Sequence, residues 1–394
     1  MESKSKGAPG FFDRERIKNS INWFVLLILF LGYALTFTVP KFFGATDRYV
    51  SLFLFCMLVL LYFNNVGFIY SLKTREKEIF FVAGVVLLNI INFIMIDSNK
   101  GAILVIGNLL MIFYLSTKVK LTKWQVYVIS MLYFVLYCVL LVYNMLYDEL
   151  VTFNPNTAAT AAIYTFLVSF VALQKLAKKY DGLGVLIVFG MVAGFRLVFW
   201  HRARGAAIML LAFFFFYYIW PKEWWRKKFA FPVWFFLATI GSLLFVAAYV
   251  LLGTTGINFQ IPFFYKPLFS GRNRIWMEIF QLFKEKPFTG IGTGIELDAF
   301  WEFNIHNAMY DLIAVYGIPV FLAIVGFLYW RMNRLKECIF KSQLSRCAFC
   351  ALLAVFFESY FDIDLIWADY GLNVMFLLFV IHWAEDKEAE SGEV

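Results

Sequence analysis

Charged residues are scarce in this sequence: they make up 16% of its 394 residues, whereas 62% are hydrophobic. A soluble domain carries about 25% charged and roughly 45–50% apolar residues. The composition therefore excludes a monomer in water and requires lipid. The apolar runs are long and continuous rather than alternating, which favours helices over a membrane barrel. We expect an all-α, polytopic transmembrane bundle that forms a single integral membrane domain over residues 1–394.

Residues that bind metals are also few. There are five cysteines and three histidines. Cys347 and Cys350 form a lone C-x-x-C pair without a second pair or a nearby histidine, which argues against zinc. No pair of Asp or Glu residues stands out as a metal site. We therefore expect no metal and no cofactor.

The net charge of +8 does not indicate a nucleic-acid partner. Most Lys and Arg residues lie in short clusters between apolar runs, the pattern that sets the orientation of membrane helices. The basic N-terminus leads into an apolar run that is long enough to span a membrane and is followed by no small-residue cleavage site. A cleavable signal peptide is therefore not expected.

Apolar runs near the length of about 20 residues that a bilayer requires predict about twelve spans. The third and fourth are separated by a very short loop and are equally compatible with a helical hairpin. The predicted spans are residues 20–39, 49–70, 79–96, 101–117, 124–146, 157–173, 182–200, 205–220, 229–252, 308–330, 347–361 and 370–383.

The distribution of cations predicts the orientation of these spans. Counted over alternate loops, 24 of the 35 Lys and Arg residues fall on one side, 10 on the other, and Arg196 lies within a span. The cation-rich side is the cytoplasmic one. Both termini are then cytoplasmic, and the longest loop, residues 253–307, is extracytoplasmic. Long loops are commonly functional, and the five cations of this loop suggest an anionic ligand; the alternative is a solvated loop surface.

Three features of the predicted outer side carry candidate chemistry. Arg196, Arg202 and Arg204 lie within or at the edge of the membrane, where an uncompensated charge is costly. Arg204 precedes the Gly205-Ala206 start of a helix, where backbone amides favour an anion. The structural alternative is that these arginines extend to the lipid headgroups.

The second feature is the run 270–274, Ser-Gly-Arg-Asn-Arg, before a short amphipathic stretch. Apolar residues at helical spacing predict a helix in the membrane interface, which would place Arg272 near the headgroups, with Arg274 off the apolar stripe. The third feature is His306-Asn307, directly before a span. A histidine there is a candidate base or proton shuttle, and the alternative is a plain interfacial histidine that caps the helix.

Residues 290–294, Gly-Ile-Gly-Thr-Gly, do not predict a dinucleotide site, because no strand precedes them and no βαβ unit follows. We interpret them as a flexible turn.

These motifs together resemble the O-antigen ligase and O-antigen polymerase superfamily of bacterial membrane glycosyltransferases. Its members show an SGR-type motif, a P-x-x-G-x-G turn, an H-N pair and a Gly-Ile in the next helix, in this order. The matching residues are 270–272, 287–292, His306-Asn307 and Gly317-Ile318. Residues 202–205 resemble the family's S-R-G motif, with Ala203 in place of serine, and residues 154–157 resemble an earlier family motif.

The resemblance implies a metal-independent, inverting glycosyltransferase of the bacterial cytoplasmic membrane. Its donor would be a glycan on undecaprenyl diphosphate, presented outside the membrane to a glycan acceptor. Arg204 and Arg272 are carried over as catalytic ligands of the diphosphate, and His306 as the residue that activates the acceptor hydroxyl. Further expected substrate contacts are Asn307, Gly271, Arg202, Arg274 and Arg196.

Three functions remain open at this point. A polymerase is favoured over a ligase, because no large soluble acceptor-binding domain is evident. A transporter of lipid-linked sugar is less favoured, since only Arg196 lies clearly inside a span and no inverted repeat is seen. A chain-length regulator and a flippase are candidate partners besides the lipid bilayer.

Overall fold

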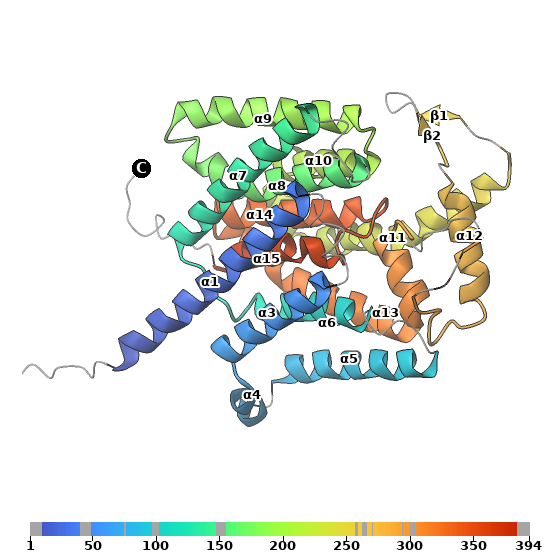
Figure 1. The fold of residues 1–394 in the computed structure, drawn as a ribbon, viewed down its shortest axis with the longest axis horizontal. Coiled ribbons are helices and arrows are strands. Elements are labelled where there is room, and N and C mark those ends of the chain that lie inside the picture. The colour runs from blue at the N-terminus through green and yellow to red at the C-terminus, as the bar shows by residue number, and fades with distance from the viewer. Residues whose placement is uncertain are drawn as a thin grey trace, which may run out of the picture.

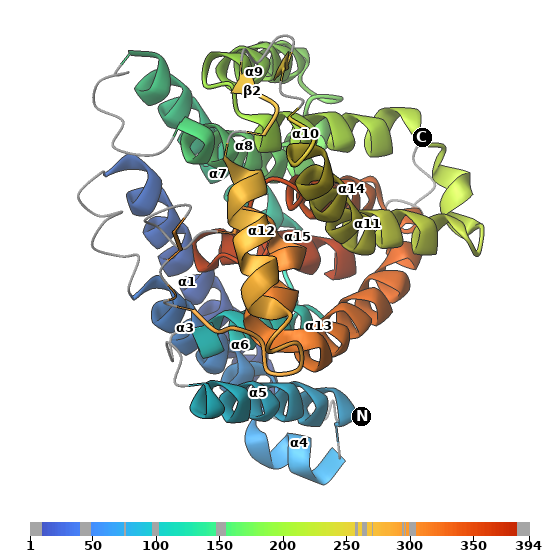
Figure 2. The ribbon, with the colours of Figure 1, turned by 90° about the vertical axis from the view of Figure 1, so that its right-hand side faces the viewer.

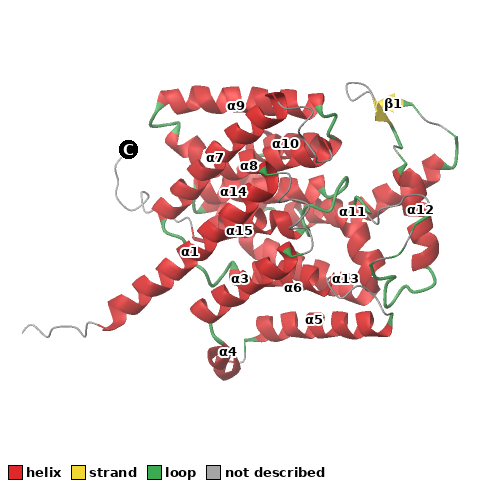
Figure 3. Cartoon of the chain, in the orientation of Figure 1, coloured by secondary structure: helices red, strands yellow, loops and turns green. Residues whose placement is uncertain are grey.

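The computed structural model is a bundle whose long helices run between two opposite faces (Figure 1). One face carries the helix α12 (Arg272–Phe283), and we call it the α12 face. Helices dominate the structure, and the strands β1 (Gln260–Ile261) and β2 (Lys266–Pro267) form one short antiparallel pair (Figure 3). The structure describes residues 10–39, 49–74, 76–96, 102–146, 155–256, 259–261, 266–269, 271–293, 295, 297–298 and 305–383.

The other helical elements follow the apolar runs of the sequence. They are α1 (Gly10–Thr38), α3 (Val50–Asn65), α4 (Phe68–Thr74), α5 (Lys77–Met95), α6 (Ala102–Leu115), α7 (Lys123–Leu146), α8 (Pro155–Leu176), α9 (Asp181–Trp200), α10 (Arg204–Phe214), η1 (Phe215–Ile219), η2 (Lys222–Arg226), α11 (Ala230–Gly253), α13 (Ala308–Leu335), η3 (Lys336–Phe340), α14 (Gln343–Glu358), η4 (Ala368–Tyr370) and α15 (Gly371–Trp383).

The predicted helical membrane fold is confirmed, and each of the twelve predicted spans contains a helix. Seven helices are long and apolar enough to cross a membrane, and α3 with α4 makes an eighth if this pair, bent by 61°, is one span. Shorter apolar helices occupy three of the other predicted spans, within residues 102–115, 204–219 and 368–382. The number of twelve spans therefore stays a prediction.

The centre of the bundle consists of α8, α14 and α15, whose side chains are buried almost throughout. The helices α9 and α5 lie at opposite edges of the bundle in Figure 1 and expose large apolar side chains, such as Phe189 of α9 and Ile94 of α5. Lipid can cover such side chains at no hydrophobic cost. This distribution of burial fits a membrane protein whose polar groups are concentrated at the two faces.

Helix α13 is broken at Gly317, whose φ of 81° and ψ of 165° are not helical. The break frees backbone carbonyls, and a turn from the preceding loop satisfies them. Ile291 N–H donates to Ala314 O (2.8 Å), and Gly292 N–H donates to Val315 O (3.1 Å). Val315 O would otherwise lack a helical donor, because the residue four positions later is a proline. The turn that the sequence suggested to be flexible is thus docked into α13.

Two glycines permit this docking. A Cβ atom on Gly317 would lie 2.2 Å from the carbonyl oxygen of Phe288, and one on Gly290 would lie 2.2 Å from the carbonyl oxygen of Val315. Both glycines also have a positive φ. The P-x-x-G-x-G turn at residues 287–292 and the Gly317-Ile318 pair therefore form one backbone contact. This contact ties the segment after α12 to α13.

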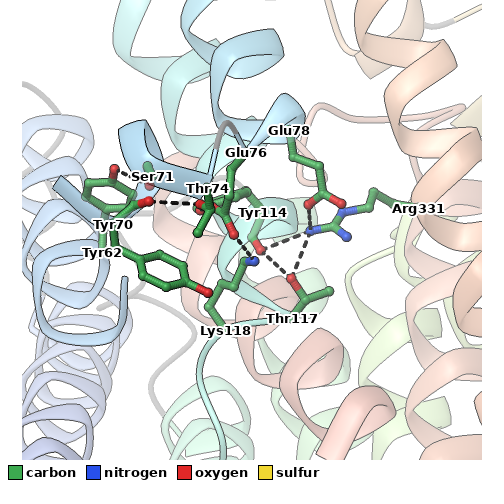
Figure 4. Close-up of polar contacts among 10 residues, drawn as sticks. All are labelled: Tyr62, Tyr70, Ser71, Thr74, Glu76, Glu78, Tyr114, Thr117, Lys118 and Arg331. Atoms are coloured by element: carbon green, nitrogen blue, oxygen red, sulfur yellow. Dashed lines mark hydrogen bonds and ion pairs between the residues drawn. The ribbon is translucent and has the colours of Figure 1, made fainter. Parts of the chain in front are cut away.

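The opposite face gathers the basic loops that charge counting assigned to a single side. Arg331 near the end of α13 forms an ion pair with Glu78 (3.1 Å), and Lys118 forms one with Glu76 (2.6 Å), as Figure 4 shows. The loops 71–78, 118–123 and 331–346 therefore meet. Their common position agrees with the predicted grouping and does not by itself identify the compartment.

Candidate active site

The backbone around Gly271 places Arg272 at the start of α12. Gly271 is the residue before the helix, and its φ of 82° is a conformation that glycine adopts without strain. The side chain of Arg272 is 9% exposed, and its Nη1 atom has no hydrogen-bond partner among the described residues. A buried guanidinium with an unused donor is prepared to bind an acceptor-rich ligand.

Arg204, at the start of α10, approaches the same place from another part of the chain. Its Nη1 atom donates to the carbonyl of Leu268 (2.9 Å), which also accepts a hydrogen bond from the hydroxyl of Tyr249. The guanidinium carbons of Arg204 and Arg272 lie 5.8 and 5.9 Å from the centre of the Phe361 ring. The structure therefore brings the two predicted diphosphate ligands together around one aromatic side chain.

The electrostatics of this pair favour an anion. Burial lowers the pKa of Arg272, Asp362 raises it, and the neighbouring Arg204 lowers it again. Arginine nevertheless remains charged under ordinary conditions. Two like charges around Phe361 repel each other, and a bound dianion would relieve the repulsion and satisfy the free donor of Arg272.

His306 precedes α13, and two parts of the fold, α12 and the segment after α14, hold the backbone on either side of it. Ile305 O accepts a hydrogen bond from the indole of Trp276 in α12 (2.6 Å). Ala308 N–H donates to Ser359 O and Asp362 O, both at 3.1 Å. The φ of His306 is 50°, an uncommon value for a residue with a side chain. Such conformations persist where the surrounding structure enforces them, and they are frequent at functional sites.

The end of α14 and the segment after it contribute acidic residues that the sequence motifs do not include. The Nδ1 atom of His306 lies 3.6 Å from Oδ1 of Asp362. Glu358 is fully buried and lies against the start of α10, where a Cβ atom on Gly205 would be 2.7 Å from its Oε1. The glycine of the motif at 202–205 thus leaves space for a carboxylate.

Asn307 is the N-cap of α13 and is fully buried. Its Oδ1 accepts from Tyr310 N–H (2.9 Å), and its Nδ2 donates to Ser242 Oγ (2.9 Å) and to Tyr360 O (3.2 Å). The cap of this helix is therefore Asn307 and not His306. The amide of Asn307 holds α11, α13 and the loop after α14 together, and its predicted contact with the sugar stays untested.

The other predicted substrate ligands are more peripheral. Arg196 on α9, Arg202 and Arg274 have exposed side chains, and Gly271 is exposed as well. Arg202 has a φ of 53°. Their roles in binding stay predictions. Ser270 and residue 154 of the two sequence motifs lie outside the described residues.

Among the described residues, no group of three or more His, Cys, Asp or Glu side chains is arranged to hold a metal ion. Burial raises the pKa of Asp362, but the neighbouring His306 and the charge of Arg272 lower it overall. Asp362 is therefore an anion near neutral pH, beside a histidine and a guanidinium.

Fold and site together define a multi-pass helical membrane protein with two arginines, a histidine and a carboxylate at one face. Residues 189–325 match the family model described as O-antigen ligase. This stretch includes Arg204, Arg272 and His306, whereas Asp362 lies outside it. No curated protein matches the chain. The match confirms, over this stretch, the predicted resemblance to the O-antigen ligase and polymerase superfamily, which implies an enzyme of the glycosyltransferase type.

Proposed function

We propose that the protein is a polysaccharide polymerase that joins oligosaccharide repeat units carried on undecaprenyl diphosphate, at the outer face of the bacterial cytoplasmic membrane. The observation that carries this proposal is the convergence of Arg204, Arg272, His306 and Asp362 from four separate parts of the chain. Such a site suits a reaction in which a hydroxyl attacks while a diphosphate leaves. The α12 face would then be the extracytoplasmic one.

In the proposed reaction, the acceptor hydroxyl attacks the anomeric carbon of the donor glycan, and its proton passes to His306. The bond between the anomeric carbon and the diphosphate oxygen breaks, and the lipid diphosphate leaves with the electron pair. Arg204 and Arg272 stabilise the charge that develops on the leaving group. Attack opposite the leaving group inverts the anomeric configuration. Asp362 orients His306 and stabilises its protonated form.

A metal ion is not required for this chemistry, because two guanidinium groups can bind a diphosphate and neutralise it. The imidazole of a histidine can take up a proton from a hydroxyl, which suits the role proposed for His306. Repeat-unit transfer to another acceptor, such as lipid A-core, would use the same groups. A ligase is therefore the second candidate function.

The experiment that tests the proposal uses purified protein and a synthetic oligosaccharide on a polyprenyl diphosphate. A ladder of products that differ by one repeat unit is the expected result. A single transfer to a foreign acceptor would indicate a ligase. Movement of the substrate across a vesicle membrane without a new glycosidic bond would contradict the enzyme assignment and favour transport.

A further inference from the structure

A second feature of the α12 face is an apolar groove with a volume of about 270 Å³ between α1, α3 and the residues at the start of α15. On α1 its lining extends from Leu29 to Thr36, which is a length of about 10 Å at the helical rise of 1.5 Å per residue. Helix α1 runs toward the α12 face and ends at Thr38. The groove therefore lies in the half of the bundle that adjoins the candidate active site.

The chemistry of the groove favours a hydrocarbon chain over a sugar. The hydroxyl of Tyr33 is already paired with that of Thr165 (2.9 Å), and the hydroxyl of Thr36 donates to Gly32 O (2.9 Å). Sugar hydroxyls in the groove would leave hydrogen bonds unsatisfied, which is costly, whereas a hydrocarbon chain has none to satisfy. Asp369 also lines the groove, and the negative charge of its carboxylate would repel a phosphate group at that point.

The groove is continuous with the loop that carries Asp362. That loop ends in η4, whose Ala368 and Asp369 form one wall of the groove. The ring of Tyr370 in η4 packs against Phe37 of α1, with ring centres 5.3 Å apart. A chain in the groove would thus lie beside the same segment that positions His306.

The groove and the helix α11, whose Tyr249 shares a hydrogen-bond acceptor with Arg204, lie on different sides of α12. In Figure 2, α1 and α3 lie on one side of α12, and α11 lies on the other. The contacts of Arg204 involve Tyr249 and Leu268, which belong to α11 and to the segment before α12. Two lipid-linked molecules could therefore approach the α12 face from different parts of the membrane.

We infer that the groove holds the isoprenoid chain of the second lipid-linked substrate, the acceptor, with its anionic head outside the groove. This inference rests on the proposed polymerase function, because a polymerase joins two lipid-linked glycans and must hold two lipids. The donor diphosphate binds Arg204 and Arg272. The acceptor lipid lies between α1 and α3, and the acceptor sugar reaches His306 past Asp362.

The test fills the groove. A Cβ atom on Gly32 would meet Phe53 at an ordinary contact distance of 3.5 Å, so Gly32→Trp would place its ring in the groove. The matched control is Gly326→Trp in a second apolar groove, of about 600 Å³, between α5 and α13, where no atom lies within 4 Å of the added Cβ. If Gly32→Trp does not fold, as judged by its thermal transition, Gly32→Leu replaces it.

The binding probe is farnesyl phosphate with a diazirine in its chain, applied to protein in lipid nanodiscs and mapped by mass spectrometry. We expect labelling of peptides that contain residues 29–36 and 50–54, loss of this labelling in Gly32→Trp and its retention in Gly326→Trp. Labelling that survives Gly32→Trp overturns the inference. Displacement of the probe by dioleoyl phosphatidylglycerol as effectively as by unlabelled farnesyl phosphate also overturns it, because the groove then holds ordinary membrane lipid.

A kinetic measurement connects the groove to the acceptor. With the wild-type protein, the KM of an undecaprenyl-linked acceptor should be lower than that of the same glycan without lipid. Gly32→Trp should abolish this difference and leave the KM of the donor unchanged. An undiminished advantage of the lipid-linked acceptor in this variant contradicts the inference. If the wild-type protein forms no glycan ladder but the probe maps to the groove, the polymerase function fails and the isoprenoid site stands.

Discussion

The Nδ1 atom of His306 lies 3.6 Å from Oδ1 of Asp362, and each side chain is 17% exposed. The main chain supports this pair, because Asp362 O accepts a hydrogen bond from Ala308 N–H (3.1 Å). A carboxylate beside one ring nitrogen fixes the ring and leaves the other nitrogen for a substrate. The relationship supports a base that is oriented from the loop after α14.

Asp362→Asn should therefore reduce kcat by roughly 10²–10⁴, because the amide removes the charge that stabilises protonated His306. His306→Ala and His306→Gln should make almost no product yet still bind the lipid-diphosphate donor. His201→Ala and His382→Ala are the controls and should remain largely active. Turnover and donor binding of purified variants provide the measurement. If His306→Gln retains most activity at normal expression, His306 is a positioning group and not a base.

The ionisation of Asp362 gives the sign of its pH dependence. Its pKa is lowered in the folded protein. The carboxylate therefore contributes stability above the ordinary pKa of about 3.9, and this contribution is lost as the pH falls through the lowered value. A loss of activity between pH 7 and 5 would consequently not arise from protonation of Asp362 itself, and a pH profile of turnover would check this.

Metal removal should leave the activity intact. The described residues offer no cluster of metal ligands, and the arginine pair supplies the positive charge that the diphosphate requires. The measurement is product formation after treatment with EDTA. Loss of activity that Mg²⁺ or Mn²⁺ restores would identify acidic ligands elsewhere. The candidates are Asp298, together with Glu296 and Glu302, which lie outside the described residues.

The contact between the two glycine motifs predicts a large effect of small substitutions. Gly317→Ala and Gly290→Ala each place a methyl group 2.2 Å from a backbone carbonyl oxygen and impose a positive φ on alanine. Strained backbone conformations of this kind cost about 1–3 kcal/mol each, and the clash adds to this cost. Thermal unfolding in detergent should show a lower transition temperature for both variants. Gly326→Ala in the same helix should be neutral, and equal stability of all three would contradict the docking of the turn.

Local sequence patterns predicted the helices and the two arginines. Apolar runs identify segments that must be helical in lipid, and the order of the motifs identifies Arg204, Arg272 and His306. Gly317 and Pro319 inside one span also carry a signal for the broken helix, because a proline removes the donor that Val315 O would use. The predicted span 308–330 was nevertheless continuous.

The carboxylate partner of His306 could not be placed in the same way. Asp362 follows a different helix, and only the packing of α14 against α10 and α8 brings its loop to His306. A weaker sequence signal was nevertheless present. Glu358, Asp362, Asp364 and Asp369 interrupt two apolar runs on the side that also carries the basic loop. Acidic residues opposite an arginine-rich loop indicate a shared site.

Membrane topology can be tested by cysteine labelling in a background without native cysteines. Lys284→Cys in the segment after α12 should react with an impermeant maleimide in intact cells. Lys341→Cys, between η3 and α14, should react only after permeabilisation. The basis is the structural separation of the two faces, together with the cation-rich loops that meet near Arg331. Reaction of both positions from the same side would contradict the proposed placement of the two faces on opposite sides of the membrane.

The arginines provide the sharpest contrast, because the first turn of α12 carries a matched pair. Arg272 is 9% exposed and points at Phe361, whereas Arg274 is exposed. Lysine keeps the charge but lacks the planar group that binds two phosphate oxygens at once. Arg272→Lys should therefore lose catalysis severely, by about 10²–10³ in kcat, the effect typical of one lost oxyanion donor. Arg204→Lys should behave likewise.

Arg274→Lys is the control and should lower kcat only mildly, since a solvated cation on the surface of α12 can be replaced by another. The three variants should be compared at equal amounts of folded protein, with turnover of the lipid-diphosphate donor as the readout. Binding of the donor should weaken in Arg272→Lys and Arg204→Lys but not in Arg274→Lys. Near-normal turnover in both Arg272→Lys and Arg204→Lys would show that these residues extend to the lipid headgroups and do not bind the leaving group.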